Sequence, residues 1–422
     1  MEAPGRCSYN PAMRRLWLLL LLLPLLAAAP GCQGSGSKPV TTGDFGQRTP
    51  ADLSGLIPEI DVGVAGQATQ KFIVDTGSPV TLLNSISFGH DADYSAEGTS
   101  EVQAFGLDFA DIPTVTYNAF SADACGDVLI AGIFGGDILQ YYSLTIDYLG
   151  SALFLWDDLR GSPDIGQDVA PSTAVTVHLK GGGKANVVGL TVTVPATRLV
   201  VDGKLETTDA TFIVDSGASM VTLPQNVFEN LGAQDRPKIT DVPVQTVYGT
   251  SNGYIVRLQS LTVGDATQTN VPAFVTPDAT LFNDLSAETG GSVVALVGGT
   301  FLRAYQTTIR YPASRIELAS YNNPVHVNPN EFVGPGFDIG AGCNGGAFVA
   351  RVYPNTSASD QSIQVGTQLV SIESQALDGM TIEEVDRLMR SYDAGAQVEM
   401  ELHAGFVSQT YTFTYSDLLP RF

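Results

Sequence analysis

Two segments of this 422-residue chain each carry an aspartate followed by a small hydroxyl residue and a glycine. Residues 72–83 read FIVDTGSPVTLL, and residues 212–224 read FIVDSGASMVTLP. In both segments a run of apolar, mostly β-branched residues predicts a buried strand that ends at the aspartate, Asp75 or Asp215. The glycine two positions later supplies the backbone freedom that a tight turn needs, and its amide can donate to the carboxylate.

A pair of carboxyl groups can carry out general acid and base chemistry. Two carboxyls within hydrogen-bonding reach cannot both ionise cheaply, so they hold one proton between them. The ionised member can take a proton from water while the protonated member polarises a carbonyl. The pair titrates as one unit, so neither role is assigned to Asp75 or Asp215 individually. A lone Asp-Ser-Gly is usually an ordinary turn or helix cap, and only its repetition makes the motif informative.

The two aspartates belong to a longer internal repeat. Each copy has a later apolar-apolar-Gly-Gly block, at residues 133–136 and 296–299, followed by closing strands. Because the order is the same in both copies, we expect a duplicated, mainly β unit at residues 53–160 and 173–321. Residues 161–172 are rich in Gly, Pro and Asp, which predicts a linker.

The paired motifs resemble the active-site turns of aspartic peptidases of the pepsin and retropepsin clan, and the short copies look more retropepsin-like. The matching residues are Asp75-Thr76-Gly77-Ser78 and Asp215-Ser216-Gly217-Ala218. The resemblance implies a mainly β fold in which two retropepsin-like or pepsin-like β-barrel lobes form a pseudo-dimer around one active site. It further implies that Asp75 and Asp215 are catalytic, and that the residues after each aspartate support the turns.

A substrate flap is another feature of that clan. The best candidate here is Tyr248, Gly249 and Thr250 in the second copy, while residues 98–106 of the first copy contain no tyrosine. Retropepsin-like enzymes use a flap from each subunit, so a flap in the second lobe is compatible with the resemblance. The alternative is that Tyr248 is an ordinary aromatic residue of a hairpin.

A C-terminal segment with a different order of predicted strands and helices follows a second linker, residues 322–333. Residues 334–416 contain strands and a helix from Ile382 to about Tyr392, with Thr381 and Glu384 forming a capping box at its start. This α+β segment resembles a PDZ domain of the bacterial type. The resemblance implies that a loop could receive the carboxylate of a C-terminal peptide. That loop consists of Gly336, Phe337, Asp338 and Ile339. A purely packing role for the segment remains the alternative.

The N-terminal residues 1–31 read as a targeting segment. Arg14 and Arg15 precede an apolar run of 14 residues, which is short of the roughly 20 needed to span a bilayer. The sequence then resembles a bacterial lipoprotein signal in which Cys32 becomes lipidated, with residues 32–52 as a flexible tether. We therefore expect an envelope protein held to the membrane through a lipid anchor only, with a cleaved signal peptide and a periplasmic or secreted protein as the alternative.

Composition limits the partners that can be expected. A formal net charge of −23 repels phosphate backbones, so no nucleic-acid partner is expected. The four histidines show no ligand spacing, so neither a metal nor another cofactor is expected. Cys125 and Cys343 could be paired or free, because sequence cannot set the distance between them.

The sequence therefore predicts an extracytoplasmic aspartic endopeptidase that hydrolyses peptides or unfolded proteins and carries a PDZ-like peptide-binding domain. The alternative is a non-catalytic envelope scaffold that binds peptides through the PDZ-like domain.

Overall fold

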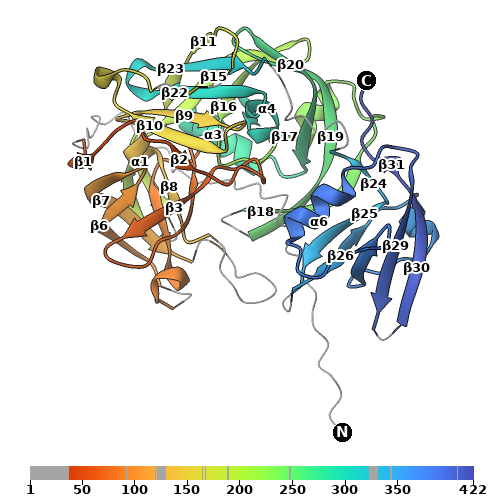
Figure 1. Ribbon diagram of the computed structural model, residues 1–422. Coiled ribbons are helices and arrows are strands. Elements are labelled where there is room, and N and C mark those ends of the chain that lie inside the picture. Colours follow the sequence, from red (N-terminus) through yellow and green to blue (C-terminus); the bar gives the residue numbers. More distant parts are fainter. Residues whose placement is uncertain are drawn as a thin grey trace.

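The computed structural model describes residues 38–422 apart from 92–93, 119, 121–129, 164, 167, 188–189, 247–248, 323–330, 343–344 and 406. Several sequence predictions lie outside the described residues: the targeting segment 1–31, Cys32, Cys125, Cys343 and Tyr248. The described chain is mainly β, which confirms the predicted fold class, and two β lobes lie beside a smaller C-terminal module (Figure 1).

The first lobe is built on a seven-stranded sheet with the order β1-β7-β5-β8-β4-β3-β6. These strands are β1 (Thr41–Gly43), β3 (Glu59–Val64), β4 (Gln70–Val74), β5 (Thr81–Asn84), β6 (Ala96–Ala104), β7 (Leu107–Tyr117) and β8 (Gly132–Phe134). The second apolar block forms β8, which is parallel to β4 and antiparallel to β5. The helix α1 (Gly136–Leu139) follows at once, and η1 (Ser85–Phe88) follows β5.

The second lobe repeats this pattern in an eight-stranded sheet with the order β12-β15-β16-β21-β17-β20-β19-β18. These strands are β12 (His178–Lys180), β15 (Arg198–Leu205), β16 (Thr208–Val214), β17 (Val221–Pro224), β18 (Ile239–Thr246), β19 (Gly249–Val263), β20 (Ala266–Thr276) and β21 (Val293–Val297). Its helices are α2 (Gln225–Asn230), α3 (Thr280–Thr289) and α4 (Gly299–Leu302). Strand β21 is parallel to β16 and antiparallel to β17, as β8 is to β4 and β5.

A six-stranded sheet joins the lobes, with the order β11-β23-β22-β9-β10-β2. The first lobe contributes β2 (Thr49–Pro50), β9 (Ser143–Asp147) and β10 (Ala152–Trp156), and the second contributes β11 (Thr173–Thr176), β22 (Tyr305–Arg310) and β23 (Arg315–Ser320). Strands β9 and β22 pair across the junction. The pseudo-dimer therefore has a continuous hydrogen-bonded base.

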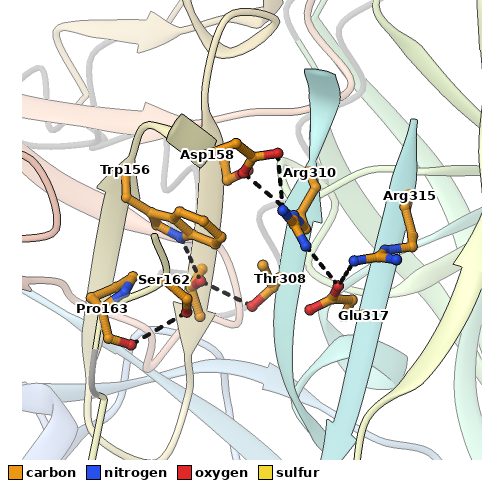
Figure 2. A network of polar contacts seen from close by, with 10 residues as sticks. Trp156, Asp158, Ser162, Pro163, Thr308, Arg310, Arg315 and Glu317 are labelled. Carbon is orange, nitrogen blue, oxygen red and sulfur yellow. Dashed lines mark hydrogen bonds and ion pairs between the residues drawn. The ribbon is translucent and has the colours of Figure 1, made fainter. Parts of the chain in front are cut away.

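Polar side chains reinforce this junction (Figure 2). The hydroxyls of Thr145 and Thr308 lie 2.9 Å apart across the β9–β22 pair, and Trp156 Nε1 donates to Thr145 over 3.2 Å. Arg310 of β22 lies over the Trp156 ring and forms an ion pair of 3.1 Å with Asp158 of the first lobe, in η2 (Asp158–Arg160). Both lobes therefore anchor the side chains of the shared sheet.

The prediction of a flexible tether at residues 32–52 is wrong for its described part. β1 pairs with β7, and β2 pairs with β10 at the end of the shared sheet. Between them, the Gly46 amide donates to the Leu155 carbonyl over 2.8 Å. The backbone groups of this segment thus satisfy exposed sheet edges, and such short strands have too few residues to show an alternating pattern.

A hairpin of the second lobe crosses to the first. Strands β13 (Gly183–Val187) and β14 (Leu190–Val194) pair only with each other, as far as the structure describes the chain. Val192 and Val194 of β14 nevertheless join the cluster of Ile73 and Ile133 under the first-lobe sheet. In the second lobe, α3 covers the corresponding face, where Phe282 and Leu285 pack with the sheet.

The C-terminal module, residues 334–416, contains a sheet with the order β25-β26-β27-β29-β30, and β28 pairs with β27. Its elements are β25 (Phe337–Ala341), β26 (Ala347–Val352), α5 (Ser357–Asp360), β27 (Gln368–Ile372), β28 (Gln375–Ala376), α6 (Ile382–Met389), β29 (Gln397–Ala404) and β30 (Val407–Thr414). The predicted capping box of Thr381 and Glu384 is confirmed. The helix ends at Met389, earlier than expected, because Arg390 adopts a non-helical C-cap conformation.

The module is fixed against the second lobe on both of its ends. Strand β24 (Val333–Gly334) pairs with β31 (Ser416–Asp417), and the following residues 418–422, here called the C-terminal strap, run onto the lobe. Arg257 of β19 donates to the Leu419 carbonyl over 2.7 Å. No helix in the described part of the chain is both long and apolar enough to span a membrane.

Candidate active site

The two aspartates lie at matching places in the two lobes, directly after β4 and β16. The Asp75 amide donates to the Phe134 carbonyl of β8 over 3.1 Å, and the Asp215 amide donates to the Val297 carbonyl of β21 over 3.0 Å. Each second apolar block therefore holds the adjacent aspartate turn from behind. Asp75 is 0% exposed and Asp215 is 3% exposed.

Each turn donates backbone hydrogen bonds to its own carboxylate. Asp75 Oδ1 accepts from the amides of Gly77, over 2.6 Å, and Ser78, over 3.1 Å. Asp215 Oδ1 accepts from the amide of Gly217 over 2.9 Å. These contacts restrict both carboxyl groups to one orientation and stabilise their ionised forms.

The two glycines also let each turn approach the opposite carboxyl. A Cβ atom on Gly77 would lie 2.5 Å from Cγ of Asp215, and one on Gly217 would lie 2.3 Å from Cγ of Asp75. No side chain fits at such distances. Glycine is therefore required at both positions, because the carboxyl of the other lobe occupies the space that a side chain would take.

The hydroxyl residues tie the two turns together across the lobe interface. Thr76 Oγ1 accepts from the Ser216 amide over 3.0 Å and donates to the Val214 carbonyl over 3.2 Å. Ser216 Oγ reciprocates, accepting from the Thr76 amide over 3.0 Å and donating to the Val74 carbonyl over 2.8 Å. This reciprocal bridge positions one carboxyl relative to the other.

The remaining residues of the turns are buried and bonded to neighbouring backbone. Ser78 Oγ donates to the Val80 carbonyl over 2.7 Å, and the Ser78 carbonyl accepts from the Gly136 amide over 2.7 Å. The Ala218 carbonyl accepts from the Gly299 amide over 2.8 Å. Every residue predicted in the two turns thus lies in one assembly around Asp75 and Asp215.

The two carboxyl groups form a coupled, buried pair. Burial raises the pKa of both, and that of Asp215 is raised further by the charge of Asp75. The hydrogen bond between the two side chains lowers the pKa of Asp75 and raises that of Asp215. Asp75 Oδ2 is buried and has no hydrogen-bond partner among the described residues. The arrangement suits a pair that holds one proton.

Two buried polar residues beside the pair were missed by sequence reasoning. Arg198 forms a buried ion pair with Glu288, and its charge lowers the pKa of both aspartates. The Tyr311 hydroxyl is buried without a hydrogen-bond partner in the described part of the chain, and the charges of both aspartates act on it. Arg198 is not repeated in the other lobe, so self-comparison could not reveal it, whereas Tyr311 recurs as Tyr148 but a repeated tyrosine did not by itself indicate a place beside the aspartates.

The predicted flap segment forms part of a hairpin. Gly249 pairs with Thr246, and Thr250 with Gln245, between β18 and β19. The β6–β7 hairpin of the first lobe, which turns at Phe105 and Gly106, corresponds instead to β19 and β20, because β7 pairs with β5 as β20 pairs with β17. The prediction for Tyr248 stays untested because that residue lies outside the described part of the chain.

The predicted carboxylate loop lies in the C-terminal module rather than beside the aspartates. Gly336 has a φ of 99°, and a Cβ atom there would lie 2.1 Å from Thr356 Oγ1. Phe337 packs edge-on against Phe413, and Asp338 accepts a hydrogen bond from the Tyr353 hydroxyl. Ile339 continues β25, the edge strand of the sheet.

A cavity of about 270 Å³ lies between this loop and the second lobe. The module contributes β25 and α6, including Ile339 and Ile382, and the lobe contributes Ser219 and Met220. Because these two residues follow Ala218, the cavity reaches the chain directly after the second aspartate turn. Figure 1 shows α6 and β25 beside β18 of the second lobe.

Comparison with known proteins gives one family match and a structural likeness. The family described as aspartyl protease matches residues 197–301, which include Asp215. A crystal structure of an aspartic proteinase from Irpex lacteus is similar in structure, with 15% sequence identity and a TM-score of 0.43. The similarity covers 68% of this chain and 99% of that chain. No curated protein matches this chain.

Proposed function

We propose that this chain is an aspartic endopeptidase in which Asp75 and Asp215 activate water for peptide-bond hydrolysis. The observation that carries the proposal is the buried carboxyl pair, with one member from each lobe and a reciprocal hydroxyl bridge behind it. The aspartyl protease match to the second lobe supports the same chemistry.

The mechanism follows from the charge of the pair. The ionised carboxylate removes a proton from water, and the protonated carboxyl polarises the scissile carbonyl, so the attacking oxygen adds without a covalent enzyme intermediate. Two amide donors favour Asp75 as the ionised member, whereas the raised pKa of Asp215 favours it as the protonated member.

Cleavage of a diverse peptide library between about pH 3 and 7 tests this proposal. The isosteric variants Asp75→Asn and Asp215→Asn should each lose at least about 10³-fold in kcat/KM, because general acid and base catalysis needs both groups. Exposed Asp108 lies on β7 away from the pair, so Asp108→Asn serves as the control. A wild-type protein that cuts nothing, or an Asp75→Asn variant that cuts equally well, would refute the proposal. Peptide binding without turnover would favour the scaffold reading instead.

We also propose that the C-terminal module binds the C-terminal segments of peptides. Strand β25 is an edge strand and can accept a further strand, and the adjacent cavity offers the apolar side chains of Ile339 and Ile382. Gly336 allows the tight entry into β25 that a carboxylate-binding loop needs. The test is to titrate the full chain, made inactive by Asp75→Asn, with peptides that end in free or amidated carboxyls. Equal affinity for both would exclude carboxylate capture.

The proposed location is the bacterial envelope, with lipidated Cys32 as the membrane anchor. The support lies in the sequence: a basic pair, an apolar run of 14 residues and a small residue before the cysteine. We expect metabolic labelling with a fatty acid to mark the wild-type chain and not the Cys32→Ala variant, which should leave the membrane fraction. Equal labelling or equal sedimentation of the two proteins would reject the lipid anchor.

A further inference from the structure

A buried ion pair lies at the start of β15, close to the two aspartates. Arg198 Nε donates to Glu288 Oε1 over 3.0 Å, and a terminal guanidinium nitrogen donates to Oε2 over 3.3 Å. The side chains are only 2% and 3% exposed. Glu288 belongs to α3, so the pair joins a strand to the helix that covers the sheet of the second lobe. Breaking such a pair on one side leaves a buried, uncompensated charge.

The strand that bears Arg198 packs against the turn of the opposite lobe. Thr197 lies beside Gly136, where a Cβ atom would come within 2.4 Å of Thr197 Oγ1. Gly136 in turn donates to the carbonyl of Ser78 in the first aspartate turn. The start of β15 is therefore in contact with the structure that holds Asp75, although its own sheet holds Asp215.

The first lobe has no equivalent charge at this position. Phe72 pairs with Ile60 in the first lobe, and Phe212 pairs with Val201 in the second. Ile60 and Val201 are therefore equivalent positions. Ile57 lies three residues before Ile60, and Arg198 lies three residues before Val201. Ile57 is buried in an apolar cluster, whereas Arg198 is buried with a carboxylate. The pseudo-twofold symmetry around the aspartates is thus broken by one buried cation.

We propose that Arg198, held in place by Glu288, is a positioning residue that favours the singly ionised form of the Asp75–Asp215 pair at acid pH. The proposal rests on the peptidase function proposed above. A nearby cation stabilises a carboxylate and therefore lowers the pH at which the pair takes up its second proton. Glu288 neutralises part of that effect and fixes the guanidinium so that it cannot turn away.

The groups that face Arg198 come from each element packed against it. Glu288 of α3 acts on it most strongly, followed by Asp215 after β16 and Asp75 after β4. Tyr311, in η3 (Tyr311–Ala313), feels the charges of Arg198 and both aspartates. Burial raises the pKa of Tyr311 far above its usual range, so this phenol stays neutral and adds no charge to the cluster.

The pH dependence of kcat/KM tests the proposal, since its acid limb reports the protonation of the free enzyme. The double variant Arg198→Met/Glu288→Met removes the charges and keeps the volume, so the acid limb should move up by about one pH unit. Glu288→Gln leaves the Arg198 cation uncompensated, so the acid limb of kcat/KM should move to lower pH. Opposite shifts from two changes at one contact are not expected of a purely structural role.

Two controls separate electrostatics from packing. Arg236 and Glu206 form another largely buried bidentate ion pair in the second lobe, with side chains 12% and 9% exposed. This ion pair is not among the largest influences on the pKa of Asp75 or of Asp215. Arg236→Met/Glu206→Met should therefore leave the acid limb in place, as should Tyr311→Phe. If the Arg198 double variant shows the wild-type limb, or if the Arg236 double variant shifts equally, the proposal is wrong.

A second readout does not depend on turnover. The carboxyl carbons of isotope-labelled aspartate can be titrated by NMR, with Asp75→Asn and Asp215→Asn assigning the two signals. The Arg198 double variant should raise the lower titration midpoint of the pair by about one unit, and Glu288→Gln should lower it. A protein that cleaves no peptide but shows these shifts would refute the peptidase function alone. Unchanged midpoints in an active enzyme would refute the role of Arg198 alone.

Discussion

The hydroxyl of Thr76 in the first lobe and that of Ser216 in the second each form hydrogen bonds with the backbone of the opposite lobe. Each hydroxyl accepts from the amide of the other residue and donates to a carbonyl on the opposite strand. These four hydrogen bonds are buried, so losing a hydroxyl leaves polar backbone groups without a partner and without water. The contacts explain why the position after each aspartate carries a small hydroxyl residue.

We expect Thr76→Val to destabilise the protein by about 1–3 kcal/mol, because the Ser216 amide and the Val214 carbonyl lose their partner. Urea unfolding followed by tryptophan fluorescence measures this change. Thr76→Ser keeps the hydroxyl and should remain close to the wild type. Equal losses in the Val and Ser variants would show that the methyl group, not the hydrogen bonds, carries the effect.

The close approach at the glycines predicts a loss of activity from a single methyl group. In Gly217→Ala the new Cβ would meet the Asp75 carboxyl, so the aspartates must separate and kcat/KM should fall by about 10²-fold or more. Gly291 is the matched control, since a Cβ there meets nothing within 4 Å. Full activity in Gly217→Ala would mean that the carboxyls do not act at this separation.

The residues of the two turns could be predicted because the chain repeats them. Duplication turned a weak three-residue motif into an assignment of Asp75 and Asp215 to one place. Arg198 had no such signal, because its counterpart Ile57 is apolar and its partner Glu288 is 90 positions away. Tyr311 does recur in the first copy as Tyr148, but a repeated tyrosine does not by itself indicate a position beside the carboxyls. Sequence comparison between lobes finds what the lobes share, whereas the charge that distinguishes them appears only in the packed structure.

Among the single elements, α1 contains a half-buried carboxylate, that of Asp137. Asp137 accepts from the amide of Thr81 over 2.9 Å and from its hydroxyl over 2.7 Å. Burial raises the pKa of Asp137 to about 6, despite these hydrogen bonds. The folded state therefore prefers the protonated form. The stability contributed by that preference is complete below the usual pKa of 3.8 and is lost as the pH rises through 6.

We therefore expect Asp137→Asn to stabilise the protein at neutral pH and to have little effect below about pH 4. The gain should be on the order of 1–3 kcal/mol, since the amide carries no charge to desolvate. Thermal unfolding of variant and wild type from pH 3.5 to 7.5 measures the difference. Asp108→Asn removes an exposed carboxylate of the same lobe and should show no such pH-dependent gain. A constant difference across the range would contradict the raised pKa.

The structure of two segments could not be predicted from their local sequence pattern. The described N-terminal strands β1 and β2 were predicted as tether because partners distant in sequence, β7 and β10, determine their structure. The β13–β14 hairpin has alternating residues, but nothing in its sequence shows that Val192 and Val194 would enter the core of the other lobe. The capped helix α6, by contrast, is specified locally by Thr381 and Glu384, and its start was predicted correctly.

At the scale of the whole molecule, the C-terminal strap sets the position of the module. Arg257 is 3% exposed, donates to the carbonyls of Leu419 and Asn270, and lies over the Phe332 ring. It thus joins three parts of the chain: the second lobe, the entry to the module and the strap. The cavity beside Ser219 and Met220 depends on this placement, because β25 and α6 form its other wall.

We expect Arg257→Met to release the module from the second lobe. The buried carbonyl of Leu419 and the half-buried carbonyl of Asn270 would lose their donor, so the strap should detach. Small-angle X-ray scattering should then give a larger radius of gyration, and added protease should cut the junction at residues 322–333 faster. Exposed Arg387 of α6 is the control. Wild-type scattering from the Arg257 variant would show that the strap is held by its apolar contacts alone.

The sheet shared by the lobes has a consequence for the order in which this protein matures. Strand β9 pairs with β22 about 160 positions further along, and the hydroxyl bridge joins residues 140 positions apart. A nascent chain that has emerged only as far as the first lobe therefore has half of the sheet and one carboxyl. Domains fold largely in order during synthesis, and long-range strand pairing is slow. The proposed hydrolytic capacity would thus appear late and all at once, so an incomplete chain could not digest the machinery that synthesises it.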